Sequence, residues 1–410
     1  MKRFLIVLAS VAVLAGTAAK AQTSDLKFKP YGFIRNYAFF DSRATKSLSE
    51  DAFFFIPLDK VVNPVSGNDL NAVSSYNFLA ITTRLGLDVT GYEIAGVKMN
   101  GKIEGDFYSM NGAVGVFRMR QAFVKLDWGA SNLLIGQAWH PMAADMAHTI
   151  ALETAAPFTP FSRSAQLQYN YNANDALTLT AALIQQMQYK SAGPDGSSNK
   201  YQRHAFPEIY LGLSYKNEGF LGRVGVDILN IRPHYGYEAL SGKKYDELLT
   251  TVSPFAYIQY TNGDFQLKAK TILAQAGEHM QLNGGYAVSG IKNDGISCEY
   301  TPFKSSVSFV SAQYKLSDNW TLLGMLGLHK GLGTSKDIVG PVYFSGNGFA
   351  NIDSMVRFTP TIQYTLGRFQ FALEYDYTTV SYGDLRDNGK VENRHSVANN
   401  RILTMVKFNL

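Results

Sequence analysis

The residues best suited to binding chemistry in this sequence are two arginines, Arg118 and Arg120, which stand two positions apart. Residues at positions i and i+2 of a β-strand point to the same face of the sheet. Guanidinium groups are always charged and present several N–H donors, so two of them on one face attract anions. The pair therefore predicts an anion-recognising surface, provided that a strand carries it.

A longer run with the same spacing lies upstream, over residues 97–107. Its odd positions are apolar or glycine, and its even positions are polar or charged, among them Lys98, Lys102, Glu104 and Asp106. Such unbroken alternation is typical of a strand with one apolar and one polar face. We expect the even positions to face water, because the opposite phase would bury four charges in an apolar environment.

Catalysis and metal binding have little support. The seven histidines form no H-E-x-x-H pair, and no G-x-S-x-G elbow is present. His329 suggests a barrel lipase with catalytic groups on its outer wall, but its phase is that of inward-facing polar residues. Cys298 is the only cysteine, which excludes a cysteine-based zinc site. Asp384, Asp387 and Glu392 leave a loop-bound calcium ion open, although their spacing matches no known calcium loop. We predict a non-enzyme without cofactor or metal.

The chain begins with an export signal. A basic start is followed by an apolar stretch over 4–14 and by the small residues Ala19 and Ala21, which form a cleavage site. We predict that residues 1–21 are a cleaved signal peptide and that 22–410 form a single domain. Loss of three leader cations lowers the net charge from +5 to about +2, which does not favour nucleic-acid binding.

Alternation runs through the rest of the chain, and helical periodicity is almost absent. A soluble sandwich also alternates, but these strands are long, at roughly 10 to 14 residues against about 5 to 6 in ordinary sheets. The connections alternate between short turns and long polar loops. These features predict an all-β fold, a transmembrane antiparallel β-barrel with short periplasmic turns and long extracellular loops. No apolar run of about 18 residues follows the leader, which excludes a helical membrane protein.

We count sixteen strands. The even number places the N-terminus and the C-terminus of the barrel domain on the same side, that of the short turns. The strands are expected at 27–40, 76–90, 95–109, 116–127, 132–139, 163–171, 176–189, 207–216, 220–232, 249–261, 264–277, 302–315, 319–331, 352–365, 368–381 and 399–410. The long polar loops are expected at 41–74, 190–206, 233–248, 278–297, 332–351 and 383–398.

The connection over residues 140–162, here called the constriction loop, differs from the other long loops. It is rich in alanine and proline and has almost no glycine or asparagine. A loop of this composition on the surface would expose apolar side chains to water. We therefore expect it to fold into the barrel and to narrow the channel.

Several segments resemble the DcaP-like outer-membrane porins of Gram-negative bacteria. They are the 32–35 and 40–41 stretches of the first strand, the run 118–124 and the run 133–139, which ends in Gly136-Gln137-Ala138-Trp139. The resemblance implies a homotrimer of sixteen-stranded barrels that passes small, mostly anionic solutes, with the third loop inside the pore. The sequence differs from that pattern in having no coiled-coil segment before the first strand and in ending on Leu410.

Strand phase assigns a set of charged residues to the lumen. The basic ones are Arg84, Lys98, Lys102, Arg118, Arg120, Arg223, Lys268, Lys270, Arg357, Arg401 and Lys407, and the acidic ones are Asp88, Glu104, Asp106, Asp227, Glu374 and Asp376. This is an excess of five positive charges inside, more than the mature chain carries overall. A pore lined by Arg and Lys favours anions.

Each of these charges could instead pair with a neighbour to fill the wall. We expect Arg84 to pair with Asp88, and Lys102 to pair with Glu104 and Asp106. Arg118 and Arg120 are the leading candidates for a selectivity wall, and we expect a bulge just after them, at Gln121. The constriction itself is expected to involve His140, His148, Glu153 and Arg163, any of which could also anchor the loop.

The sequence thus predicts an outer-membrane porin that lets small hydrophilic solutes diffuse passively, with a preference for anions of the carboxylate type. Its expected partners are small anionic or neutral solutes, outer-membrane lipid and lipopolysaccharide, and two further copies of the chain. The alternative is a surface barrel without transport, an adhesin or scaffold. Barrel size separates the two, because sixteen strands leave an aqueous channel whereas about eight fill themselves with side chains.

Overall fold

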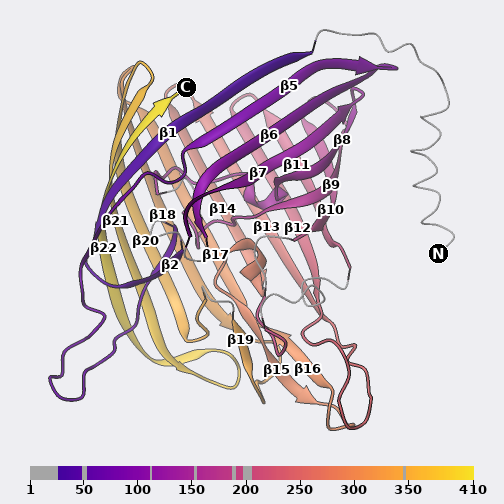
Figure 1. Cartoon of the computed structure of the whole chain (residues 1–410), viewed down its shortest axis with the longest axis vertical. Helices are drawn as coiled ribbons and strands as arrows, with labels where there is room; N and C mark the ends of the chain where they lie inside the picture. The colour runs from indigo at the N-terminus through magenta and orange to yellow at the C-terminus, as the bar shows by residue number, and fades with distance from the viewer. Residues whose placement is uncertain are drawn as a thin grey trace.

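The computed structural model describes residues 26–48, 53–110, 113–151, 155–186, 191–196, 206–344 and 348–410. Over these ranges the chain forms one closed antiparallel barrel (Figure 1). No helix in the described part of the chain is long and apolar enough to cross a membrane. The leader expected at 1–21 lies outside the described residues.

The described wall has sixteen strands, as expected, with β4 and β5 forming one interrupted strand. The bounds are β1 Lys27–Asp41, β4 Ser75–Leu79, β5 Arg84–Ile94, β6 Val97–Met110, β7 Ala113–Asp127, β8 Ser131–Trp139, β9 Arg163–Asn172, β10 Leu177–Gln185, β11 Glu208–Asn217, β12 Phe220–Ile231, β13 Leu249–Asn262, β14 Phe265–Gln275, β17 Lys304–Lys315, β18 Trp320–Gly333, β20 Ile352–Leu366, β21 Phe369–Leu385 and β22 Val391–Asn409. The ring closes where β1 pairs with β22. Closure leaves no unpaired sheet edge, which is what a barrel in lipid requires.

The interruption between β4 and β5 occurs where both pair with β1. Thr82 adopts a left-handed backbone conformation there, with a φ of 70°. Its hydroxyl accepts a hydrogen bond from Arg35 Nε at 2.9 Å, and the backbone N–H of Arg35 donates to Thr83 at 3.2 Å. These bonds hold the kink in place, and β5 restarts at Arg84.

The prediction of a long loop at 383–398 is wrong. β21 and β22 continue through this segment and leave only a short turn between Leu385 and Val391. Ser381 lies opposite Ser396, and Asp384 lies opposite Glu392. Polar strands of this kind are stable beyond the lipid because water surrounds them. The hairpin extends past the wall on the side opposite the start of β1 and the C-terminus (Figure 1).

Other loops on that side carry small elements of their own. They are β2 Thr45–Leu48 and β3 Phe53–Pro57, which pair with each other, β15 Gly285–Ile291, β16 Cys298–Pro302 and β19 Val342–Phe344, which form a second sheet, and the 3-10 helices η1 Pro141–Ala143 and η2 Gly277–Met280. The long loops therefore form structure around and inside the mouth of the barrel.

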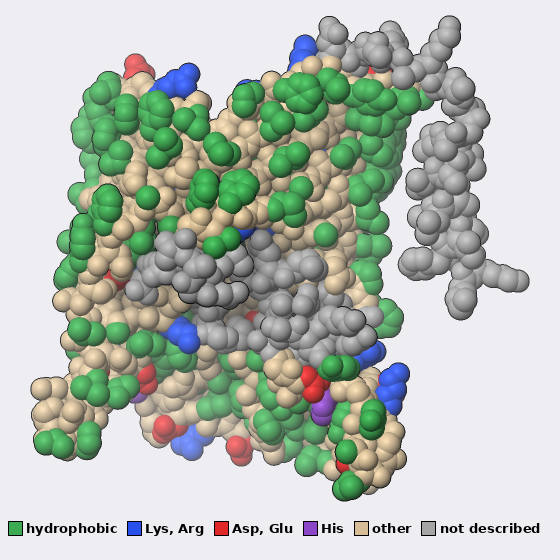
Figure 2. Space-filling view, in the orientation of Figure 1, with side chains coloured by type: hydrophobic (Ala, Val, Ile, Leu, Met, Phe, Trp, Pro, Cys, Tyr) green, Lys and Arg blue, Asp and Glu red, His purple; other side chains and the backbone are tan. Residues whose placement is uncertain are grey.

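The outer surface of the wall is apolar. On β18, Leu322, Leu326 and Leu328 are exposed, and the side chains between them face inward. On β6, Ile103 is exposed while Glu104 and Asp106 are buried, which is the phase expected from the alternation. Figure 2 shows hydrophobic side chains spread over the wall and charged ones near its two rims. This distribution suits a barrel surrounded by lipid.

The inner surface is less polar than strand phase suggested. Inward-facing aromatic and aliphatic side chains form two buried clusters together with the constriction loop. The wall residues in these clusters include Tyr37, Phe39, Leu403, Phe255, Tyr257, Ile272, Phe309, Met325 and Met355. The hydrophobic core of the molecule therefore lies inside the barrel, between the wall and the loop.

Candidate functional site

The described parts of the constriction loop, residues 140–151 and 155–162, are folded into the lumen, as its composition predicted. Met142 is fully buried, and Ile150 and Phe158 keep only 4% and 1% of their surface exposed. Phe158 fits against Gly327, where a Cβ atom would stand 2.5 Å from the ring. A glycine at this position of β18 is therefore what lets the loop approach the wall.

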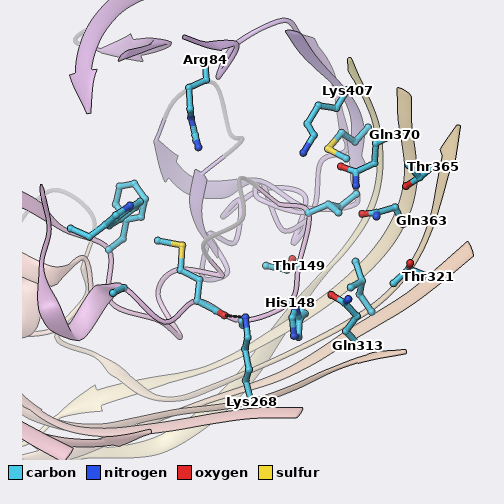
Figure 3. A pocket seen from close by; sticks show the side chains of 18 of the residues that line it. Arg84, His148, Thr149, Lys268, Gln313, Thr321, Gln363, Thr365, Gln370 and Lys407 are labelled. Carbon is cyan, nitrogen blue, oxygen red and sulfur yellow. Dashed lines mark hydrogen bonds between the residues drawn. The ribbon is translucent and has the colours of Figure 1, made fainter. Parts of the chain in front are cut away.

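Cations from the wall hold the loop by its backbone. Lys270 Nζ donates to the carbonyl oxygens of Met142 and Asp145 at 2.7 and 2.8 Å. Lys268 Nζ donates to the carbonyl of Met146 at 3.2 Å (Figure 3). Cation–carbonyl hydrogen bonds of this kind are stronger than neutral ones, and buried carbonyls need a partner.

Two further arginines hold the loop at separate points. Arg223 Nη1 lies 3.0 Å from the carboxylate of Asp145, and Arg357 Nη1 donates to the carbonyl of Ala156 at 2.9 Å. Arg357 and Lys270 are almost fully buried. Their assignment as pore-lining residues is therefore corrected, because they lie beneath the loop and not at open space.

One buried carboxylate supplies the complementary contact. Glu374 on β21 accepts hydrogen bonds from the hydroxyl of Thr149 at 2.9 Å and from the backbone N–H of Ile150 at 2.8 Å. The hydroxyl of Thr361 donates to the same carboxylate at 2.7 Å. Cations thus hold the carbonyls of the loop, and Glu374 holds its donors.

A buried histidine–carboxylate cluster anchors the start of the loop. His140 Nε2 lies 2.7 Å from Glu208, and His279 Nε2 lies 3.1 Å from Asp227. All four side chains are at most 2% exposed. Burial lowers the pKa of His279, but attraction to Glu208 and a hydrogen bond with Asp227 outweigh it and raise the pKa above its ordinary value.

Three of these residues, His140, Glu208 and Asp227, stand close enough together to suggest a metal centre. The hydrogen bonding of His140 does not fit one. Its Nδ1 accepts a hydrogen bond from the backbone N–H of Met142 at 3.1 Å, so the ring proton is on Nε2, the atom that faces the carboxylates. The cluster therefore acts as a hydrogen-bonded anchor.

His279 belongs to a second segment inside the barrel, which the sequence did not predict. This segment contains η2, and its residues Gly277 to Met280 are all buried. The residues that flank it, Ala276 and Gln281, both have positive φ angles, of 45° and 58°. The carbonyl of Met280 accepts a hydrogen bond from Phe161 N at 2.8 Å. The constriction loop is thus held between the wall and this segment.

One open space beside the loop is a cavity of about 670 Å³ that reaches toward the short-turn end of the barrel. Figure 3 shows Arg84 and Lys407 pointing into it across from Lys268 and His148, with amide and hydroxyl groups between them. Its charged lining consists of Arg84, Arg120, Lys268, Lys315 and Lys407 against Glu104 and Asp318. Five cations therefore face two carboxylates.

A β-bulge determines which residues of β7 reach the lumen. Glu104 lies opposite Gln121 and Gly105 lies opposite Met119, so Arg120 is the extra residue. Arg118, Arg120 and Gln121 all face inward as a result, while Met119 and Val124 are exposed outside. The expected bulge is confirmed, one residue earlier than predicted.

Both arginines of β7 are ion-paired. Arg118 Nε lies 2.8 Å from Asp106, and Arg120 lies 2.7 Å from Glu104 and 2.8 Å from Asp106. Only Arg120 borders the cavity. The expected pairing of Lys102 with Glu104 and Asp106 was therefore wrong, because these two carboxylates form ion pairs with Arg118 and Arg120.

The neighbouring pairings change accordingly. Lys102 pairs with Asp88 at 2.8 Å, and Arg84 lies 4.0 Å from Glu104. Lys98 is exposed near the start of β6, opposite Glu93 and Asp127. Neither lysine borders the cavity beside the loop.

The described residues expected at the constriction do not all border the cavity. His148 borders the cavity, and burial together with the charge of Lys268 lowers its pKa to about 4. Arg163 is fully buried, 5.0 Å from the ring centroids of Trp139 and Phe161. Arg163 and His140 therefore support the loop, while Glu153 lies outside the described residues.

Comparison with known proteins matches no family model and no curated protein sequence. Solved structures do match. The outer membrane channel DcaP of Acinetobacter baumannii superimposes with a TM-score of 0.66 at 17% identity, over 96% of this chain and all of that one. This chain shares the fold of the DcaP channel. The resemblance to DcaP-like porins is thereby confirmed at the level of the fold.

Two further outer-membrane barrels agree. The trimer form of OmpT, an outer membrane protein of Vibrio cholerae, gives a TM-score of 0.53 at 11% identity, over 94% of this chain and 99% of that one. OmpF of Salmonella typhi, in complex with daunomycin, gives 0.50 at 11% identity, over 94% and 98%. At these identities the likeness establishes the barrel architecture.

Proposed function

We propose that the protein is an outer-membrane porin of a Gram-negative bacterium, which passes small hydrophilic solutes by diffusion and prefers small anions of the carboxylate type. The cavity beside the constriction loop carries this proposal, because five cations and two carboxylates line it. Fixed positive charges lower the barrier for anions entering a narrow channel. Amide and hydroxyl groups such as Gln313, Gln363 and Thr321 provide hydrogen bonds to a carboxylate.

The barrel architecture supports the remaining parts of the proposal. Its apolar outer wall suits lipid, and one of the similar structures is a trimer form. We propose a homotrimer that uses no cofactor and catalyses no reaction. A cavity of about 670 Å³ inside sixteen strands favours a channel over the alternative of an adhesin or scaffold.

The test is electrical. The mature chain is reconstituted in a planar bilayer, and its reversal potential is measured in a potassium chloride gradient. The expected reversal potential lies toward that of chloride, and replacing chloride by succinate should preserve the inward anion current. A reversal potential toward potassium would contradict the anion preference. A folded, inserted barrel without conductance would favour the surface-scaffold alternative.

A further inference from the structure

A lysine interrupts the lipid-facing side of β18. Leu322, Leu326 and Leu328 occupy the outward phase of this strand, and Lys330 follows in the same phase with about half of its side chain exposed. Leu332 then resumes the apolar pattern. An outward lysine is costly within hydrocarbon but stable among charged headgroups.

The strand register places this lysine at the edge of the apolar surface. Leu328 lies opposite Val356, whereas Lys330 lies opposite Ser354 in the next row. The same polar row continues through Ser381 and Ser396 on β21 and β22. The outer wall thus changes from aliphatic side chains to hydroxyl and charged groups within one pair of residues. This change marks the level of the lipid headgroups.

A buried carboxylate organises the charges at this level. Asp353 lies 2.6 Å from Lys330 Nζ and 3.2 Å from Arg394 Nη1. Its own side chain is only 10% exposed, while those of Lys330 and Arg394 are about half exposed. One carboxylate therefore fixes two cations and neutralises only one of them.

The hairpin of β21 and β22 completes a groove around these charges. Thr334 N donates to the carbonyl of Asn388 at 2.9 Å, which holds the hairpin tip over the end of β18. The groove has a volume of about 390 Å³, and Lys330, Asp353, Lys390, Glu392 and Arg394 line it together with Leu332. Glu392 is paired with Arg386 at 2.7 Å, so the groove keeps a positive excess.

We propose that this groove binds the phosphate group of a phosphorylated lipid in the outer leaflet of the membrane. Lys330, Lys390 and Arg394 would hold the phosphate oxygens, because ammonium and guanidinium groups form charge-assisted hydrogen bonds with them. Leu328, one row closer to the apolar part of the wall, would contact the acyl chains. The inference rests on the proposed membrane location and adds a defined lipid site to it.

The test compares two double variants with equal loss of charge. The purified trimer is incubated with diphosphorylated lipid A and bound lipid is counted by native mass spectrometry. The variant K330Q/R394Q should bind at least tenfold less than the unchanged protein. The control K292Q/K336Q, which removes two loop lysines that pair with Glu247 and Glu299, should bind normally. Equal binding by both variants would overturn the proposal.

Two further probes separate the possible ligands. Lipid A without phosphate groups should bind at least tenfold more weakly than the diphosphorylated form, and inorganic phosphate at the same concentration should not displace it. Equal binding of both lipids, or displacement by inorganic phosphate, would overturn a lipid-phosphate site. Conductance is measured on the same samples. Lost lipid binding with unchanged conductance leaves the porin proposal standing, and its failure would appear as absent conductance with normal lipid binding.

Discussion

The two inner walls of the barrel carry the same kinds of cation but use them differently. On the wall beneath the constriction loop, Lys270 and Arg357 donate to loop carbonyls and are buried. On the wall across the cavity, Arg84 and Lys407 point into open space (Figure 3). The strand phase is the same in both cases. The role of an inward cation is therefore decided by what lies opposite, and not by the strand that carries it.

Removing the loop should have the largest effect, because it abolishes the difference between the two walls. Replacing residues 143–158 with a short Gly-Ser link frees the lumen volume now filled by side chains such as Phe158 and Ile150. Single-channel conductance should rise severalfold. Heat-modifiable migration in detergent gels checks that the barrel still folds. A well-folded variant with unchanged conductance would place the narrowest point elsewhere, for example at the η2 segment.

Charge reversal on the open wall should have the next largest effect. The double variant R84E/K407E changes the charge along the cavity by four units, enough to exceed its present positive excess of three. We expect the reversal potential in a salt gradient to move from the chloride side to the potassium side. An unchanged reversal potential would show that these residues do not line the ion path.

The paired arginines are less suited to that experiment. Replacing Arg118 and Arg120 by glutamate would bring four carboxylates together, Glu104 and Asp106 included, and would leave only Arg84, 4.0 Å from Glu104, as a cation from the ion pairs described above. Like charges at this spacing disfavour the folded state. The K270M variant, on the wall beneath the loop, gives a cleaner contrast with R84E/K407E.

The substitution Lys270→Met removes the donor of one buried and one partly buried carbonyl and keeps the volume of the side chain. Each orphaned carbonyl costs about 1–3 kcal/mol, so the loop should detach more often. We expect a noisier open-channel current with unchanged ion selectivity. The control Lys315→Met, at the open cavity, should reduce anion preference without added noise. If Lys270→Met changed the ion selectivity and Lys315→Met added current noise, Lys315 would hold the loop and Lys270 would line the ion path, contrary to our assignment.

The smallest effect concerns pH. His148 lies on the loop, and its pKa is lowered from 6.5 to about 4 by burial and by Lys268. Below pH 6.5 a detached loop gains a proton that the docked loop does not accept until about pH 4, so docking weakens as the pH falls through this window. Current noise should increase between pH 6.5 and 4, and the variant His148→Asn should remove the part due to this group. If the unchanged protein and the His148→Asn variant show the same dependence of current noise on pH, the titrating group is a residue other than His148.

Much of the architecture could be predicted because strand phase is a local property. Alternation over 97–107 and the turns between strands define the wall without knowledge of distant contacts. The bulge at Arg120 was also detectable, since the apolar phase changes after Gln121 within one segment. The unusual composition of residues 140–162 was enough to place this loop inside.

The contacts of the loop could not be predicted in the same way. Thr149 and Glu374 are 225 positions apart, and His140 and Glu208 are 68 apart. No local pattern connects such pairs. The η2 segment was missed for a related reason, because its polar composition is that of an exposed loop, while the partners of the buried His279, among them Asp227 and Glu208, lie far away in the sequence. The hairpin at 383–398 was missed because polar strands beyond the lipid lack the alternation used to find the others.

The way in which the wall holds the constriction loop bears on how this channel can vary. Lys268, Lys270 and Arg357 contact peptide carbonyls, which every amino acid possesses. The side chains at Ala144 and Met146, which border the cavity, can therefore be exchanged without removing these attachments. At these two positions the backbone anchoring is thus independent of the side chain, whereas Thr149, which also borders the cavity, holds the loop through its hydroxyl. A designer could alter the aperture residue by residue on this scaffold, and natural variants could do the same without having to evolve a new attachment for the loop.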